Sequence, residues 1–314
     1  MAERWGARAI PDLTGRTALV TGANSGLGYE TARALAHRGA TVLLACRDEQ
    51  RGAGARDRLR TEDPAGRVEL VMLDLADLDS VRRSADEVLQ RDGTLDLLVN
   101  NAGVMAVPQR RTTAQGFELQ MGTNHLGHFA LTGLLLPALL RAAGSRVVTV
   151  TSRNHHFAKD LRVDDLQSER RYTPFDAYNR SKLANALFTL ELDRRLKAGG
   201  TTVLSLAAHP GFSKTELQWT GPRTGGLSAR AWLLSFGTQL LGQPAATGAL
   251  PTLRAAVDPT MTGGELLGPR GPAELWGAPR FVSYSPLARD PALAAELWRR
   301  SEELTGVPIG LRRP

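Results

Sequence analysis

A phenol and an ammonium stand four residues apart in the segment Tyr178-Asn179-Arg180-Ser181-Lys182. Residues at this spacing lie one turn apart on the same face of a helix. A tyrosine next to a lysine can give a proton to a carbonyl oxygen as a hydride reaches the carbonyl carbon, and can take the proton back in the reverse reaction. The alternative is a structural tyrosine beside a surface lysine, because such pairs are ordinary on helices.

The reference pKa of a phenol, about 10, makes tyrosine a weak base near neutral pH. We expect Lys182, together with the positive ring of an oxidised nicotinamide, to lower the pKa of Tyr178. Ser152 ends the run V-T-V-T-S and can hold the carbonyl oxygen by a hydrogen bond. Thr151 is predicted to be a strand residue whose side chain points to the other face of the sheet.

A glycine-rich segment, T-G-A-N-S-G-L-G, follows the first apolar run and precedes a helical pattern. Gly22 can take the turn that leaves the strand, Gly26 lets the backbone approach a pyrophosphate, and Gly28 lets the helix pack closely on the sheet. The first N–H groups of that helix then face the anion. The alternative is a glycine-rich turn without a ligand. The predicted cofactor contacts in this loop are Gly22, Asn24, Ser25, Gly26, Leu27 and Gly28.

The end of the second predicted strand, Ala45-Cys46-Arg47, indicates which dinucleotide binds. An acid at this place binds the ribose hydroxyls of NAD, whereas an arginine accommodates the 2′-phosphate of NADP. An uncharged thiol followed by the guanidinium of Arg47 therefore favours NADP(H). A surface arginine is the alternative. Asp74, at the end of the third strand, is predicted to accept from the adenine amino group or to cap the helix that begins near Leu78.

Short apolar runs alternate with longer amphipathic ones from about residue 17 to about residue 209, which is typical of βαβ units around a buried parallel sheet. The pattern predicts an α/β fold, a single-domain Rossmann-type doubly wound parallel sheet flanked by helices. The predicted strands are Thr17–Thr21, Thr41–Ala45, Val68–Leu73, Leu95–Asn100, Val147–Thr151 and Val203–Ala207. The clearest predicted helices are Leu27–Arg38, Leu78–Gln90, His125–Ala142 and Tyr178–Leu196.

The predicted domain organisation is an N-terminal extension, 1–16, followed by one dinucleotide-binding and catalytic domain, 17–314. Glycine, proline and threonine become frequent after Pro210, and a short apolar helix pattern, Ala231–Leu241, follows. We interpret the stretch at about 211–243 as an insertion that forms a lid over an apolar substrate. A helix that only packs on the sheet is the alternative. A last strand at Gly264–Leu267 and a terminal helix at about 290–305 are also predicted.

Composition excludes several classes of protein. The 314 residues include 39 Lys and Arg against 32 Asp and Glu, a net charge of +7, but the arginines are mixed with acids, as on solvated surfaces, so we expect no nucleic-acid partner. One cysteine allows no internal disulfide, no apolar run approaches the roughly 20 residues of a membrane span, and the first residues lack a secretory signal. These features predict a cytoplasmic protein without an integral membrane segment.

Four histidines are interpreted without a metal. His155 and His156 follow Ser152, but no ligand spacing accompanies them, so we predict loop residues near the substrate entrance and no metal. His125 and His128 are interpreted as packing or hydrogen-bonding groups.

Taken in order, T-G-x-x-x-G-x-G, N-N-A-G at Asn100 to Gly103, a strand-end serine and Y-x-x-x-K resemble the short-chain dehydrogenase/reductase family over nearly the whole chain. Within it, A-C-R-D, T-N-H-L-G-H-F, A-Y-N-R-S-K-L-A-N and A-H-P-G are similar to the retinol dehydrogenase and WW-domain oxidoreductase branch. Thr151 stands where serine is more usual in that family, and no membrane anchor precedes residue 17.

The resemblance implies that Asn124 is the fourth catalytic residue, beside Ser152, Tyr178 and Lys182, and that it holds a water next to Lys182 for a proton relay. It implies that Asn100 supports the central strands, and dimers or tetramers are common in the family. The further cofactor contacts that it implies are Leu75, Asn101, Ala102, Gly103, Tyr178, Lys182, Pro210, Gly211 and Thr215.

The function expected is that of an NADP(H)-dependent enzyme that transfers hydride between the nicotinamide and a small-molecule carbonyl or alcohol, with an apolar or bulky substrate. The alternative from another class is a non-catalytic NADP(H)-binding redox sensor, although sensors of that kind commonly lose the tyrosine or the lysine. A sugar-nucleotide epimerase would carry a different glycine spacing and a larger C-terminal domain.

Overall fold

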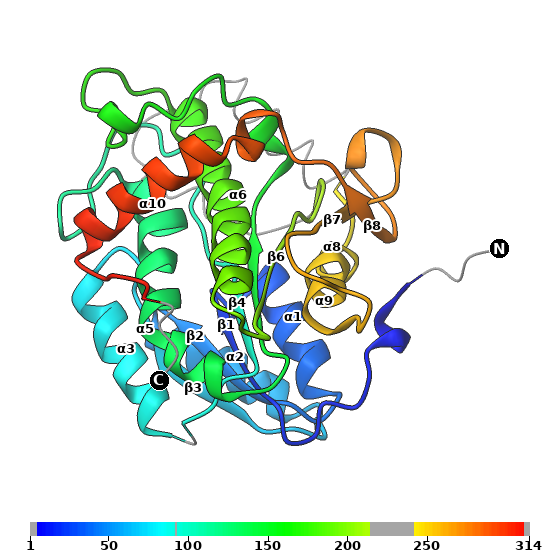
Figure 1. Ribbon diagram of the computed structural model, residues 1–314. Helices are drawn as coiled ribbons and strands as arrows, with labels where there is room; N and C mark the ends of the chain where they lie inside the picture. The colour runs from blue at the N-terminus through cyan, green and yellow to red at the C-terminus, as the bar shows by residue number, and fades with distance from the viewer. Residues whose placement is uncertain (1–4, 92, 214–241, 311–314) are drawn as a thin grey trace.

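An eight-stranded sheet forms the middle of the computed structural model, which describes residues 5–91, 93–213 and 242–310 (Figure 1). The strand order is β3-β2-β1-β4-β5-β6-β7-β8, with every neighbouring pair parallel except β7 and β8. The order reverses between β1 and β4, and ligands of such sheets bind outside the carboxyl ends of the strands at this reversal. The strands are β1 (Thr17–Thr21), β2 (Thr41–Cys46), β3 (Val68–Met72), β4 (Leu97–Asn100), β5 (Arg146–Val150), β6 (Leu204–Ala208), β7 (Leu266–Pro269) and β8 (Pro279–Val282).

Helices cover both faces of the sheet (Figure 1). One face carries α1 (Gly26–Ala36), α2 (Glu49–Arg60), α8 (Ala245–Gly248) and α9 (Leu250–Val257). The other carries α3 (Leu78–Gln90), α4 (Leu119–Met121), α5 (Gly127–Arg141), α6 (Pro174–Ala198) and α10 (Pro291–Thr305). Strand β1 shows why both faces must be covered: Leu19 belongs to one hydrophobic core, and its neighbours Ala18 and Val20 belong to the other.

The predicted α/β fold with a doubly wound sheet is confirmed, and the predicted strands lie within two residues of the observed ones. Strand β4 begins at Leu97 rather than at Leu95, because the Leu95 N–H donates to the Ala138 carbonyl instead of joining the ladder. The sequence analysis missed β8. This strand is the antiparallel edge of the sheet, and its Phe281 side chain is exposed, so the sequence shows no buried apolar run there.

The predicted lid lies mostly at 214–241, together with the predicted helix Ala231–Leu241, outside the residues that the structure describes. The described residues on either side of it lie together: Ser213 forms a β-bridge with Gln243, and Gln243 Nε2 donates to the Pro210 carbonyl at 2.8 Å. The lid and the division of the chain at residue 17 stay predictions. Among the described residues, the helices are all too short or too polar to cross a membrane.

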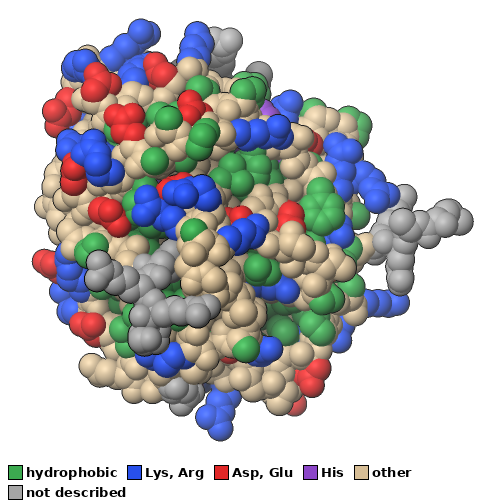
Figure 2. Space-filling model, in the orientation of Figure 1, with side chains coloured by type: hydrophobic (Ala, Val, Ile, Leu, Met, Phe, Trp, Pro, Cys, Tyr) green, Lys and Arg blue, Asp and Glu red, His purple; other side chains and the backbone are tan. Residues whose placement is uncertain are grey.

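Positive and negative side chains are interspersed on the surface (Figure 2). The ion pairs join residues close in sequence, such as Arg170 with Asp164, and residues of different elements, such as Arg33 with Glu62. Exposed pairs of this kind contribute about 0–1 kcal/mol each, so the stability of the fold comes from its two cores.

Helix α10 closes the core over α5 and α6. The Trp298 indole is 2% exposed, and its ring centre lies 5.2 Å from that of Phe129 and 5.9 Å from that of Phe188. Its Nε1 donates to Glu302 at 3.0 Å, so the one polar atom of the ring has a partner. The predicted terminal helix is present. The sequence predicts Leu293, Leu297 and Trp298 on one side of it, and in the structure Leu297 and Trp298 are buried and Leu293 is half-buried.

We expect Trp298→Ala to lower the free energy of unfolding by about 3–5 kcal/mol, because it leaves a cavity lined by aromatic rings. Phe175→Ala is the matched control, since its aromatic side chain is 47% exposed and its loss should cost no more than about 0.5 kcal/mol. Chemical denaturation measures both values. Equal losses in the two variants would show that α10 is not part of the core.

Candidate active site

The long helix α6 carries Tyr178 and Lys182 one turn apart, as their spacing predicts. Pro174 at its first turn and Gly199 after its end fit the usual helix boundaries. Most of α6 is buried, and Tyr178 and Lys182 are only 6% and 4% exposed. Both side chains line an open cleft at the carboxyl ends of the central strands, which the glycine-rich loop also lines.

The end of β5 supplies the partners of this pair. The hydroxyl of Ser152 forms a hydrogen bond with the Tyr178 phenol, and the ammonium Nζ of Lys182 donates to the Val150 carbonyl at 3.0 Å. The Thr151 hydroxyl donates to the Lys182 carbonyl at 2.8 Å. Strand β5 ends at Val150, although the Thr151 N–H still donates to the Ala208 carbonyl of β6 at 2.9 Å. The predicted direction of the Thr151 side chain is wrong, because its hydroxyl binds α6, the helix that Ser152 also contacts.

Burial sets the pKa values of the pair in opposite directions. It raises the pKa of Tyr178 to about 12, against which the hydrogen bond with Ser152 acts, and it lowers the pKa of Lys182 to about 8. Lys182 Nζ lies 5.8 Å from the centre of the Tyr178 ring and faces the Val150 carbonyl. In the protein alone, desolvation is the largest influence on the phenol. The expectation that Lys182 and an oxidised nicotinamide together lower the pKa of Tyr178 stays a prediction.

Asn124 lies in a π-helical turn, Gly122–Leu126, before α5, and is fully buried. Such turns are rare and often occur at functional sites. Its Oδ1 accepts from the Val104 N–H at 2.8 Å, and its Nδ2 donates to the Val104 carbonyl at 2.9 Å and to Ser181 Oγ at 2.9 Å. With both amide hydrogens committed, the side chain holds the cleft wall at Val104 against α6, and does not itself line the cleft.

The glycine-rich loop has the geometry that an anion site needs. Gly22 and Gly26 have φ angles of +65° and +55°, which favour glycine. A Cβ on Gly28 would lie 2.4 Å from the Gly22 carbonyl oxygen and 2.6 Å from Asn101 Nδ2. Ser25, the N-cap of α1, makes no side-chain capping bond to any described residue, so the first N–H groups of the helix lack the cap that would satisfy them.

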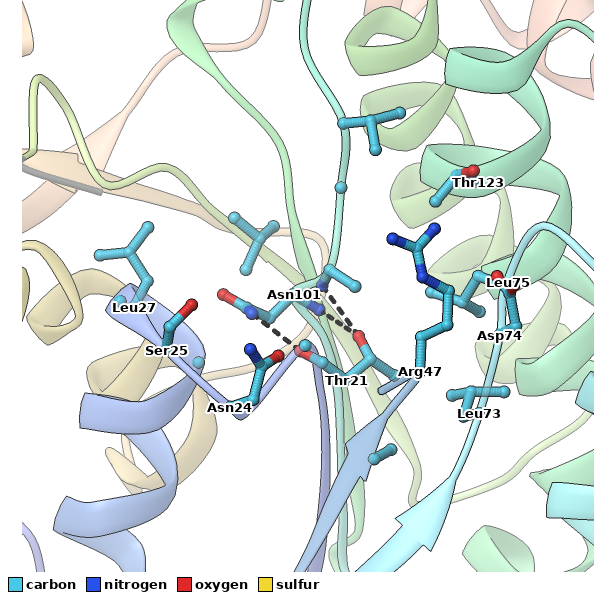
Figure 3. A pocket seen from close by; sticks show the side chains of 18 of the residues that line it. Thr21, Asn24, Ser25, Leu27, Arg47, Leu73, Asp74, Leu75, Asn101 and Thr123 are labelled. Atoms are coloured by element: carbon cyan, nitrogen blue, oxygen red, sulfur yellow. Dashed lines mark hydrogen bonds between the residues drawn. The ribbon is translucent and has the colours of Figure 1, made fainter. Parts of the chain in front are cut away.

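The cleft gathers most of the residues predicted to bind the cofactor (Figure 3). They are Gly22, Asn24, Ser25, Gly26, Leu27, Gly28, Arg47, Asp74, Leu75, Asn101, Ala102, Gly103, Tyr178, Lys182 and Pro210. Three predicted site residues are not part of the lining: Gly211, which follows Pro210, and Ser152 and Asn124. Thr215 is outside the described residues. The sequence analysis did not assign Thr21, Val104 or Thr123 to the cleft, although Thr21 and Thr123 begin two of the motifs quoted there.

The cleft is basic beside the end of β2. Arg47 extends from the end of β2 into the cleft, toward the side where Asp74 and Leu75 lie (Figure 3), and makes no ion pair with a described residue. Arg51, one turn later, also lines the cleft and was missed, although its i+4 spacing from Arg47 could have indicated it. Asp48 beside them accepts from the Arg51 backbone N–H at 2.9 Å and caps α2.

Asp74 does not cap α3, so that alternative is wrong. The cap is Asp77, whose carboxylate accepts from the Asp79 N–H, because it directly precedes the helix. One oxygen of Asp74 accepts from the Ala76 N–H at 2.9 Å. The Cys46 thiol is 1% exposed and is not part of the lining, and burial raises its pKa to about 11.

His155 is buried rather than placed in an open loop. Its Nδ1 lies 2.6 Å from the Ser152 carbonyl, and its Nε2 accepts from the Ser285 N–H at 3.1 Å. Burial lowers the pKa of His155 to about 4, so the ring is neutral and ties Ser152 to the segment after β8. Among the described residues, no three His, Cys, Asp or Glu side chains are arranged to hold a metal ion.

Comparison with known proteins gives concordant results. The short chain dehydrogenase family matches residues 16–224. Human retinol dehydrogenase 12 is 42% identical over 300 residues, which cover 96% of this chain and 89% of that protein. The crystal structure of an uncharacterised Mycobacterium paratuberculosis protein is 44% identical, with a TM-score of 0.81 over 98% of this chain and 100% of that one. An NAD(P)-dependent gluconate 5-dehydrogenase of Beutenbergia cavernae, with NADP bound at low occupancy, is 25% identical, with a TM-score of 0.63 over 81% of this chain and 95% of that one.

We expect Gly28→Ala to weaken NADPH binding by at least about tenfold and to lower Tm, because the new Cβ would push α1 away from the Gly22 carbonyl. Gly54→Ala in α2 is the matched control: its Cβ would meet no atom within 4 Å, and alanine favours a helix by about 0.5–1 kcal/mol. Fluorescence titration and thermal melting separate the two. Unchanged NADPH affinity in Gly28→Ala would show that the loop does not bind the dinucleotide.

Proposed function

Because this chain belongs to the short-chain dehydrogenase family, in the retinol dehydrogenase branch, we propose that it transfers hydride between NADP(H) and a carbonyl or alcohol of an apolar or bulky substrate. The observation that carries the proposal is that one cleft is lined by the glycine-rich loop, by Tyr178 and by Lys182. A dinucleotide with its pyrophosphate at the loop would occupy the same cleft as this pair.

Each of the four predicted catalytic residues has a separate role in the proposed reaction. Bound nicotinamide supplies or accepts the hydride. The Tyr178 phenol, protonated below a pKa of about 12, is the proton donor to the substrate oxygen in reduction. Ser152 hydrogen-bonds to that phenol and thereby fixes where the substrate oxygen is held. Lys182, anchored by the Val150 carbonyl, holds its ammonium near the phenol, and Asn124 supports this arrangement through Val104 and Ser181.

The preference for NADP(H) rests on the basic end of the cleft. Arg47 and Arg51 line it together, and a guanidinium pair suits a 2′-phosphate better than two free ribose hydroxyls. The bound NADP of the Beutenbergia cavernae relative supports the same choice.

The apolar substrate is suggested by relatives named for retinol, an apolar alcohol. The single cysteine fits a reducing compartment, and the cytoplasm is the location that we propose.

Purified protein with NADPH or NADH, tested against small aldehydes, bulky ketones and the matching alcohols, measures the proposed activity through nicotinamide absorbance. Turnover with NADPH and a bulky carbonyl is the expected result. A protein that binds NADPH tightly and turns over no member of the panel would instead favour the redox sensor.

We expect Tyr178→Phe to bind NADPH normally and to lose about 10²–10⁴-fold in kcat, because only the proton donor is removed. Tyr29→Phe is the matched control, since the phenol of Tyr29 faces Glu62 at 3.2 Å and does not line the cleft. Steady-state kinetics and cofactor titration measure the two effects. A kcat close to that of the wild type in Tyr178→Phe would remove the tyrosine from the mechanism.

We expect Arg47→Ala to lower kcat/KM for NADPH about tenfold or more at low salt, with NADH nearly unaffected, because a charge-assisted hydrogen bond contributes about 1.5–3 kcal/mol. Arg51→Ala should act in the same direction, and the double variant should lose more than either. Arg56→Ala, which removes a surface arginine paired with Asp57, is the control. Equal losses of kcat/KM for NADPH and NADH would mean that neither arginine binds the 2′-phosphate.

A further inference from the structure

His128 joins two parts of the site that no motif connects. It lies in the first turn of α5 and is 1% exposed. Its Nε2 lies 2.9 Å from the hydroxyl of Thr21, at the end of β1, and its Nδ1 lies 3.0 Å from the main-chain carbonyl of Asn124. A single imidazole therefore spans the distance between the strand that leads into the glycine-rich loop and the π-helical turn.

The hydrogen positions follow from counting donors. The Thr21 hydroxyl accepts from the N–H groups of Asn101 and Ala102, each at 2.9 Å, which uses both lone pairs. Its one hydrogen then goes to His128 Nε2 at 2.9 Å rather than to the Val99 carbonyl at 3.4 Å. Nε2 is the acceptor, so the proton of the neutral ring is on Nδ1 and is donated to the Asn124 carbonyl.

Burial agrees with this assignment, because it lowers the pKa of His128 to about 4 and keeps the ring neutral. A neutral imidazole has one donor and one acceptor, and each has a single partner here. The tautomer is therefore fixed by Thr21 at one end and by Asn124 at the other.

The two ends of this chain of hydrogen bonds contact different parts of the site, the glycine-rich loop and the helix that carries Tyr178 and Lys182. On one side, Asn101 Nδ2 donates to the Thr21 carbonyl at 2.8 Å (Figure 3). The segment that Thr21 binds also packs closely on the glycine-rich loop, since a Cβ on Gly22 would lie 3.0 Å from the Ala102 Cα. Thr21 therefore holds in place the residues against which the loop packs. On the other side, Asn124 holds Val104 and the Ser181 hydroxyl, which directly precedes Lys182.

We propose that His128 is a positioning residue whose Nε2 orders the dinucleotide side of the cleft through Thr21 and whose Nδ1–H orders the catalytic side through Asn124. The second half rests on the proposed function, whereas the first half concerns dinucleotide binding alone. The two ring nitrogens can be removed separately, which makes the proposal testable.

His128→Asn and His128→Gln form the test. An asparagine amide nitrogen takes roughly the place of Nδ1, and a glutamine amide oxygen roughly the place of Nε2. We expect His128→Asn to raise the Kd of NADPH about tenfold, since the Thr21 hydroxyl loses its acceptor, with kcat at saturation within about threefold of the wild type. His128→Gln should lower kcat about tenfold and leave Kd within about threefold.

His125→Asn and His125→Gln are the matched controls. His125 is equally buried and lies three residues earlier, but its Nε2 is 2.9 Å from Ser301 on α10, away from the cleft. These controls should change Tm without separating Kd from kcat. Parallel changes of Kd and kcat in both His128 variants, or changes in Tm alone as for His125, would overturn the proposal.

Failure of the proposed function is distinguishable from failure of this inference. If wild-type protein turns over no substrate, the Kd of NADPH still has to differ between His128→Asn and His128→Gln, and equal values would overturn the role of Nε2. The imidazole ¹⁵N shifts of wild-type protein give a test without any variant at this position, with the resonance assigned by replacing the other five of the six histidines in turn. A proton on Nδ1 is expected, and a proton on Nε2 would overturn the proposal even if both variants fail to fold.

Discussion

The burial of helix α6 is the constraint on which the rest of the site depends. Polar groups on a buried helix must find partners, since an unsatisfied one costs about 1–3 kcal/mol. Arg180 does so fully: it is 1% exposed, and its guanidinium donates to the carbonyls of Leu161, Arg162 and Asp165 and to the Ser168 hydroxyl. Two residues away on either side, Tyr178 and Lys182 obey the same requirement, and the end of β5 supplies their partners.

The same burial disfavours the charged form of both Tyr178 and Lys182. A phenol and an ammonium have similar pKa values in water, but here burial separates them, to about 12 for Tyr178 and about 8 for Lys182. As pH rises, the ammonium therefore loses its proton before the phenol does. The protonated phenol is the stable form over the whole neutral range, which suits a proton donor in carbonyl reduction. The phenolate that oxidation requires depends on additional positive charge in the cleft.

Charge is distributed differently at the other end of the cleft. Arg47 and Arg51 line it and are exposed. The carboxylates beside them accept from backbone N–H groups: Asp48 caps α2, and one oxygen of Asp74 binds the Ala76 N–H. The net charge of the chain is +7, and the guanidinium groups of Arg47 and Arg51 come from the end of β2 and the start of α2. Their position, more than the net charge of the chain, is the basis of the proposed preference for NADP(H).

The sequence by itself determined the fold class and the main members of the site. Apolar runs of strand length and the i,i+4 spacing of Tyr178 and Lys182 are local patterns, and the glycine-rich loop is recognisable because its geometry needs glycine within a few adjacent positions. Only the tertiary structure decided which distant groups meet. Thr21 and His128 are 107 residues apart, and Asn124 and Ser181 are 57 apart, so no spacing in the chain reveals either contact. The exposed edge strand β8 and the bond of Thr151 to α6 escaped the sequence for the same reason: each is set by packing between elements and not by the pattern within one.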